Sequence, residues 1–165
     1  MTPEEQKLHK NRLLIGIYRS SWGTSTLTLC VVAVLEVFML VYSVMNSELY
    51  GPYLWKYRSF YIVLLAAALI YLALNAYVKR DMERRFAVLH VANPVYAVLF
   101  FGWALGITWS DLLITGVVDP VVFITFSLTI LLGFYLSPAV YAVITAAADA
   151  LIIAMVLSNC GISAC

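Results

Sequence analysis

Two carboxylates stand in the middle of long apolar runs of this chain. Glu36 lies near the centre of the first run and Asp149 near the centre of the last, and these two runs contain no Lys or Arg. An ionised carboxylate at the centre of a bilayer costs at least about 2.5 kcal/mol, so both side chains are expected to face protein, at the same depth. Protonation, hydrogen bonds from nearby hydroxyls, or a bound cationic or polar ligand would each make such a position tolerable.

An amide followed by a proline adds polarity to the third apolar run. Pro94 has no N–H, so it leaves the carbonyl of His90 without its helical partner, while Asn93 brings a donor and an acceptor to the same bend. The candidate ligand-binding residues are Glu36, Asp149, Asn93, Tyr96 and Tyr135. The alternative is that neutral carboxyls only tie helices together, and the residues alone leave both interpretations open.

No motif of a known catalytic or metal centre occurs in the chain. It contains no glycine-rich phosphate loop, no His-Glu-x-x-His, no closely spaced aspartate pair and no Gly-x-Ser-x-Gly. His90 has no Cys or carboxylate three or four residues away, so it is expected to hydrogen-bond a neighbour rather than a metal. The three cysteines, Cys30, Cys160 and Cys165, are not spaced as metal ligands. We therefore expect neither a cofactor nor an enzymatic activity in this chain.

The composition indicates the elements that must position these residues. Of 165 residues, 64% are hydrophobic and only 12% are charged, against about 25% charged in a soluble domain. A membrane-spanning helix needs about 20 mainly apolar residues. The sequence therefore predicts an all-α, polytopic membrane bundle of five spanning helices, over residues 25–45, 57–78, 86–109, 120–136 and 138–158.

The segments around these runs complete the predicted organisation. Residues 1–22 are expected to form either a short amphipathic helix at the membrane surface or a solvated basic leader, with a break at residues 23–25 before the membrane domain of residues 23–159. Ser137-Pro138 ends one run and begins the next, which predicts that the fourth and fifth helices form a hairpin. Residues 160–165 form a tail.

The distribution of charge predicts the orientation. Residues 79–85 carry four basic side chains, and together with the leader they account for eight of the ten Lys and Arg. Basic loops face the cytoplasm, so the N-terminus is expected inside and the C-terminus outside. The outer boundary is then rich in aromatic side chains, whose simplest role is anchoring and whose alternative role is ligand stacking: Tyr50, Tyr53, Trp55, Tyr57, Trp103 and Trp109. The net charge of +1 offers no surface for nucleic acid.

The order of these elements resembles a known family. The basic leader, the outer loop ending Leu54-Trp55-Lys56-Tyr57-Arg58-Ser59-Phe60-Tyr61, the basic inner loop and the sequence Gly133-Phe134-Tyr135-Leu136-Ser137-Pro138 are similar to the N-terminal membrane sensor regions of bacterial diguanylate cyclases with a GGDEF domain. The resemblance implies a homodimer in the bacterial cytoplasmic membrane that signals to a cytoplasmic cyclase. The chain has no GGDEF motif, so we expect either the sensor portion of a longer protein or a stand-alone relative with a separate output partner.

Two functions follow as hypotheses. The first is a membrane-embedded sensor that binds a small-molecule or lipid ligand and regulates a cytoplasmic output domain. The second is a small transporter or substrate-binding membrane subunit that uses Glu36 and Asp149. Discontinuous helices and repeated halves would favour the transporter. Pro94 is the one candidate break and no repeat is evident, so the sensor ranks first.

Overall fold

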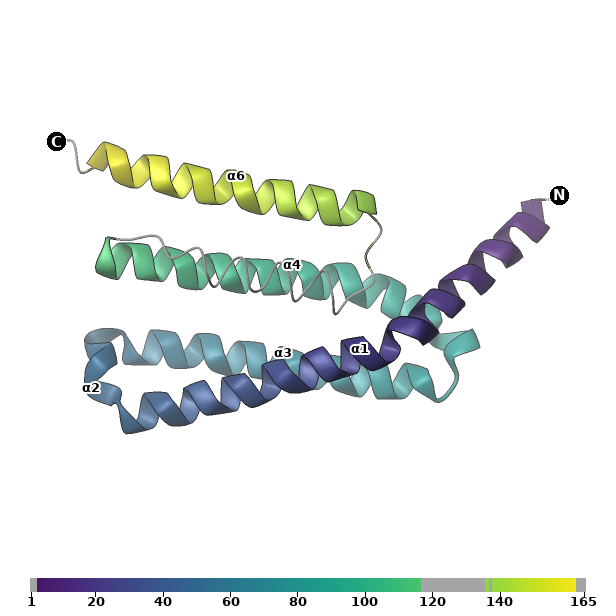
Figure 1. Ribbon diagram of the computed structural model, residues 1–165, viewed down its shortest axis with the longest axis horizontal. Coiled ribbons are helices and arrows are strands. Elements are labelled where there is room, and N and C mark those ends of the chain that lie inside the picture. Colours follow the sequence, from purple (N-terminus) through teal and green to yellow (C-terminus); the bar gives the residue numbers. More distant parts are fainter. Residues whose placement is uncertain (1–2, 117–135, 137, 163–165) are drawn as a thin grey trace.

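The computed structural model describes residues 3–116, 136 and 138–162, and within these ranges the chain is helical and contains no strands (Figure 1). The elements are α1 (Pro3–Met45), α2 (Ser47–Tyr50), the 3-10 helix η1 (Gly51–Tyr53), α3 (Leu54–Lys79), α4 (Met82–Thr115) and α6 (Pro138–Ile162). In the described part of the chain, four helical stretches are long and apolar enough to cross a membrane: α1, α2 through α3, α4 and α6. The predicted all-α class is confirmed at this level.

The predicted fourth span, residues 120–136, lies outside the described residues except for Leu136. The same holds for Tyr135 and for the predicted hairpin between the fourth and fifth helices. The predicted fifth span is confirmed as a helix, because α6 covers residues 138–158 completely.

The predicted break between the leader and the first span is wrong. Helix α1 continues through Gly23 without interruption, and its first turns project away from the other helices (Figure 1). A glycine inside a helix costs only about 1 kcal/mol relative to alanine. Contacts from Trp22 and Ser25 to Asn75 of α3 hold both sides of Gly23 against the same neighbour, and this packing outweighs the local preference for a break.

The turn between α3 and α4 is shorter than the sequence suggested. Helix α4 begins at Met82 rather than at residue 86, so the turn consists of Arg80 and Asp81. The backbone N–H of Arg85 donates to the Asp81 carbonyl over 3.0 Å, which starts the α4 hydrogen-bond ladder inside the basic segment. Arg and Glu are good helix formers, so charge does not stop the helix here.

The helices pack in a defined order. Helix α3 packs against both α1 and α4, α4 also touches α1, and α6 packs against α4. Figure 1 shows α4 between α6 and the pair formed by α1 and α3. Residues of α4 between Gly102 and Trp109 and residues of α6 between Leu151 and Ser158 line one groove. Figure 1 shows that these two helices run in the same direction.

Small side chains lie at the helix contacts and large apolar ones face outward. Ala68, Ala97 and Ala104 are fully buried, and Ala148 is buried on α6. Small residues let membrane helices approach closely. Large apolar side chains on the outer faces are more than half exposed, among them Leu27, Val34, Val143 and Leu157. Such a surface suits lipid rather than water.

The two ends of the bundle differ in composition, one being basic and the other aromatic. The basic end is formed by the α3–α4 turn with residues 79–85 and by the part of α1 around Arg19. The aromatic end is the opposite one, formed by α2, η1, the start of α3 and the end of α4.

Candidate functional site

Glu36 is buried between helices, as the sequence analysis expected. Its side chain is only 5% exposed, and its Oε2 atom has no hydrogen-bond partner among the described residues. The phenol of Tyr61 on α3 is near enough to interact electrostatically with it. A buried carboxyl oxygen without a donor is costly, so this position calls for a proton, a cation or a polar ligand.

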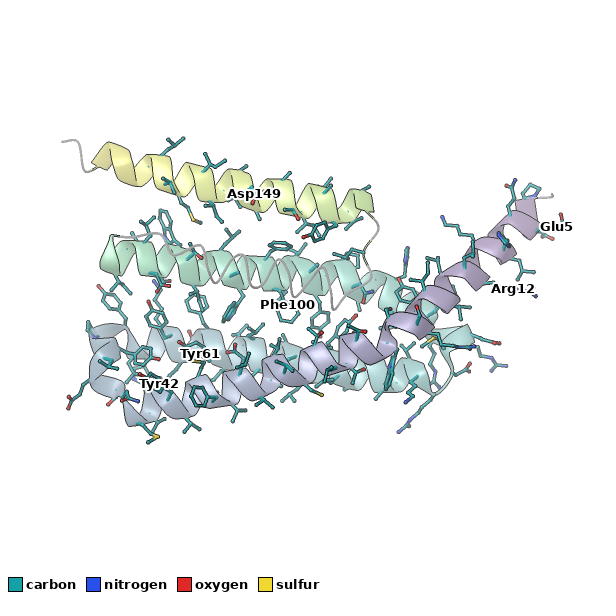
Figure 2. All side chains as sticks on the ribbon, viewed as in Figure 1. Glu5, Arg12, Tyr42, Tyr61, Phe100 and Asp149 are labelled. Carbon is teal, nitrogen blue, oxygen red and sulfur yellow. The ribbon has the colours of Figure 1, made fainter. Side chains whose placement is uncertain are left out.

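Asp149 lies on a different part of the bundle. Its side chain is exposed on α6, and no hydrogen bond or ion pair joins it to another described residue. Figure 2 shows Asp149 on α6 and Tyr61 on α3, with α4 and its Phe100 between them. The expectation that both acids face the bundle holds for Glu36 only, and the two carboxylates share no cavity formed by the described residues. The reason is the packing order, in which α6 contacts α4 rather than α1.

The expected depth of the two acids agrees with the helix contacts. Hydrogen bonds from Asn75 to Ser25 and from Arg58 to Ser43 set the register of α3 on α1 and place Glu36 level with the middle of α3. Figure 2 shows Asp149 of α6 near the level of Phe100 of α4. Both acids therefore lie in the middle layer of the bundle, on separate faces.

A buried hydrogen-bonded network joins α1, α3 and α4 between Glu36 and the basic end. The Tyr71 phenol donates to Asn93 Oδ1, and both side chains are almost completely buried. Asn75 Nδ2 donates to Ser25 Oγ over 3.1 Å, and Trp22 Nε1 donates to the Asn75 carbonyl over 3.4 Å. Polar groups that are satisfied in this way fix the relative positions of membrane helices.

Aromatic rings extend this network along α4. The rings of Tyr71 and Tyr96 meet edge to face, with centroids 4.4 Å apart, and Tyr96 continues to Phe100 at 6.3 Å. Towards the basic end, a hydrogen bond of 3.3 Å joins the Tyr18 hydroxyl to His90 Nδ1. This bond confirms the prediction that His90 pairs with a neighbouring side chain.

Two of the predicted site residues, Asn93 and Tyr96, thus belong to one buried cluster. The other polar members of this cluster were not singled out from the sequence; they are Tyr18, Trp22, Ser25, Tyr71 and Asn75. Asn75 carried a usable signal, because an amide within an apolar run has the same cost as Asn93 and needs the same kind of partner. A tyrosine or a serine in such a run is too common to single out from sequence.

Pro94 does not interrupt α4, which remains one helix from Met82 to Thr115. The residues next to the proline are held from outside the helix. His90 is bonded to Tyr18 of α1, and Asn93 is bonded to Tyr71 of α3. Neighbouring helices therefore brace the segment where the backbone ladder of α4 lacks a donor.

A second polar group lies at the aromatic end. Arg58 donates to Ser43 through Nε, at 3.2 Å from Oγ, and through Nη2, at 3.0 Å from the backbone oxygen. The Tyr57 phenol donates to Asp111 of α4. These bonds join the start of α3, which follows α2 and η1 in the chain, to α1 and to α4.

The aromatic side chains of this end divide into two kinds. Trp55 is 74% exposed and Tyr53 is also exposed, as expected of anchors at a membrane surface. Trp103 is only 8% exposed, and its indole donates to the Phe60 carbonyl over 2.7 Å. The expectation that Trp103 anchors the boundary is wrong, because it lies deep enough on α4 to pack against α3.

The described residues offer no donor set for a metal ion, since no three His, Cys, Asp or Glu side chains in them converge. Cys30 is a free, exposed thiol on α1. Comparison of the chain with protein-family models, with curated proteins and with solved structures finds no match in any of the three.

Proposed function

We propose that this chain is a membrane-embedded sensor domain that binds a small-molecule or lipid ligand beside Glu36 and regulates a cytoplasmic output domain. The observation that carries the proposal is the buried carboxyl of Glu36, which has an unpaired oxygen among the described residues. Buried amides and phenols elsewhere in the bundle are hydrogen-bonded, whereas Oε2 of Glu36 has no partner among the described residues. An intramembrane carboxyl of this kind marks a functional site more often than a structural one.

The helix that carries Glu36 supports a signalling role. Because α1 is one unbroken helix, a shift at Glu36 moves the turns that project beyond the basic end. The network of Tyr71, Asn93, Asn75 and Ser25 couples α1 to α3 and α4 on the way. A sensor needs an element with two arrangements whose balance a ligand can shift, and we propose α1 for this role.

The orientation and the number of spans belong to this proposal. Helix α4 ends at the aromatic end, whereas α6 begins at the basic end and runs parallel to it. This geometry supports a fifth crossing over residues 120–136. The basic residues at 79–85 favour a cytoplasmic N-terminus and an outer C-terminus of this chain. The resemblance to sensor regions of diguanylate cyclases suggests a homodimer with cyclase output.

The transporter alternative has less support. It calls for discontinuous helices around a shared central site. Within the described residues, α1, α3 and α4 are each continuous, and Glu36 and Asp149 face different surroundings.

Glu36→Gln tests the sensor proposal. The amide keeps the size of the side chain and removes its charge and its acidity. In cells that produce the chain with its own output domain or partner, the variant is expected to abolish the regulated change in cyclic di-GMP, at an unchanged level of protein in the membrane.

Glu48→Gln is the matched control, because Glu48 is an exposed carboxylate on α2 and the chemical change is the same. This variant should keep the wild-type response. A full response from Glu36→Gln at the wild-type membrane level would rule out the proposed site.

A further inference from the structure

The basic end holds a depression between α1 and the α3–α4 turn. Its volume is about 510 Å³. The lining residues are Arg19, Trp22, Lys79, Arg80, Asp81 and Glu83, together with Met82 at its base. We propose that this depression binds the phosphate of an anionic phospholipid headgroup. The site is separate from Glu36 and goes beyond the sensor function.

The charge of the lining favours an anion. Arg19, Lys79 and Arg80 contribute three positive charges, and no described carboxylate forms an ion pair with any of them. Asp81 lies 3.8 Å from Arg84 Nε, so a cation outside the depression already opposes its charge. The depression therefore has three cationic side chains and two carboxylates, Asp81 and Glu83. The charge of Asp81 is partly balanced by Arg84, which lies outside the depression.

A fixed aromatic wall positions one of the cations. The Lys79 ammonium lies 3.8 Å from the centroid of the Trp22 ring, and the Trp22 indole donates to the Asn75 carbonyl. Cation–π contact keeps the ammonium at the rim without neutralising it. The hydrogen bond to Asn75 holds the ring in place, so the Trp22 ring is positioned before a ligand binds.

The position of the depression identifies a lipid rather than a free anion. It lies where apolar helices meet the basic turn, the level at which Trp side chains and headgroups gather. Trp22 and Met82 offer apolar surface beside the cations, which fits a phosphate attached to a glycerol backbone and acyl chains. Basic pockets between spanning helices bind headgroups in this way. A lipid held here would join α1 to the α3–α4 turn.

Native mass spectrometry of the detergent-solubilised chain tests the site, with phosphatidylglycerol as the titrated lipid. Arg19→Gln, Lys79→Gln and Arg80→Gln should each weaken its binding about fivefold, the effect of removing one basic residue near a membrane surface. Lys10→Gln removes the same charge from the exposed, projecting part of α1, outside the depression, and should bind as the wild type does.

Two further measurements on the wild type identify the source of the phosphate. Phosphatidylcholine should bind more weakly than phosphatidylglycerol, and inorganic phosphate at the same concentration should not displace phosphatidylglycerol. Equal binding of both lipids, displacement by inorganic phosphate, or equal affinity of all four variants would overturn the proposal. The comparison of the two lipids needs no variant, so it can overturn the proposal even if a substitution prevents folding.

Discussion

The phenol of Tyr71 and the amide of Asn93 form a hydrogen bond in the apolar interior between α3 and α4. In such surroundings a lost partner costs more than an intact bond contributes, because the remaining group cannot turn to water. The same reasoning applies to Asn75 and Ser25 one turn away. At the scale of single residues, stability therefore depends on how these few polar atoms are paired.

Tyr71→Phe tests this pairing. The substitution keeps the ring against Tyr96 and removes the donor to Asn93, so the free energy of unfolding should fall by about 1–3 kcal/mol. Unfolding in mixed micelles with increasing SDS, followed by circular dichroism, measures the change. Tyr42→Phe removes the same hydroxyl from an exposed ring and should stay within about 0.5 kcal/mol of the wild type. An equal loss of unfolding free energy in the two variants would show that the buried hydrogen bond contributes no more to stability than an exposed hydroxyl does.

At the scale of elements, two glycines four residues apart on α4 have different surroundings. A Cβ added to Gly106 would lie 3.0 Å from Cε1 of Phe60, whereas a Cβ on Gly102 would meet no atom of the described residues within 4 Å. Gly106 thus marks the close approach of α3 and α4, next to the bond from Trp103 to the Phe60 carbonyl.

Alanine at each glycine separates helix propensity from packing. Gly102→Ala should raise the free energy of unfolding by up to about 1 kcal/mol, since alanine favours the helix. Gly106→Ala gains the same preference but pushes on the Phe60 ring, so it should be the less stable of the two variants. The same SDS titration compares them. A more stable Gly106→Ala would mean that Phe60 moves aside freely.

At the scale of the whole molecule, charge placement predicts the orientation. In intact cells, a thiol reagent that cannot cross the membrane should label Cys160 or Cys165 after mild reduction, which opens any disulfide between them. A cysteine introduced at Arg80 in the α3–α4 turn should stay protected, with Cys30→Ala as the background. Labelling of the turn and protection of the tail would show that the topology is the reverse of the predicted one.

The sequence by itself determined the class of the molecule and the placement of most spans. An apolar run of about 20 residues has few alternatives to a membrane helix, because the bilayer leaves backbone groups no other partners. The burial of Glu36 could be predicted because a charged side chain is costly in lipid. The polar surroundings of Asn93 and Tyr96 could be predicted for the same reason. These conclusions depend on transfer from water to lipid, which each segment experiences on its own.

The tertiary structure decided which faces meet. Asn75 pairs with Ser25, Trp103 is buried rather than at the surface, and Asp149 lies on α6, which packs against α4 rather than against the α1 helix of Glu36. Each outcome depends on the packing order and register of the helices. In lipid, those are set by many small contacts and a few interhelical hydrogen bonds, not by hydropathy. The unbroken α1 has the same origin, since packing on α3 overrides the local preference of Gly23.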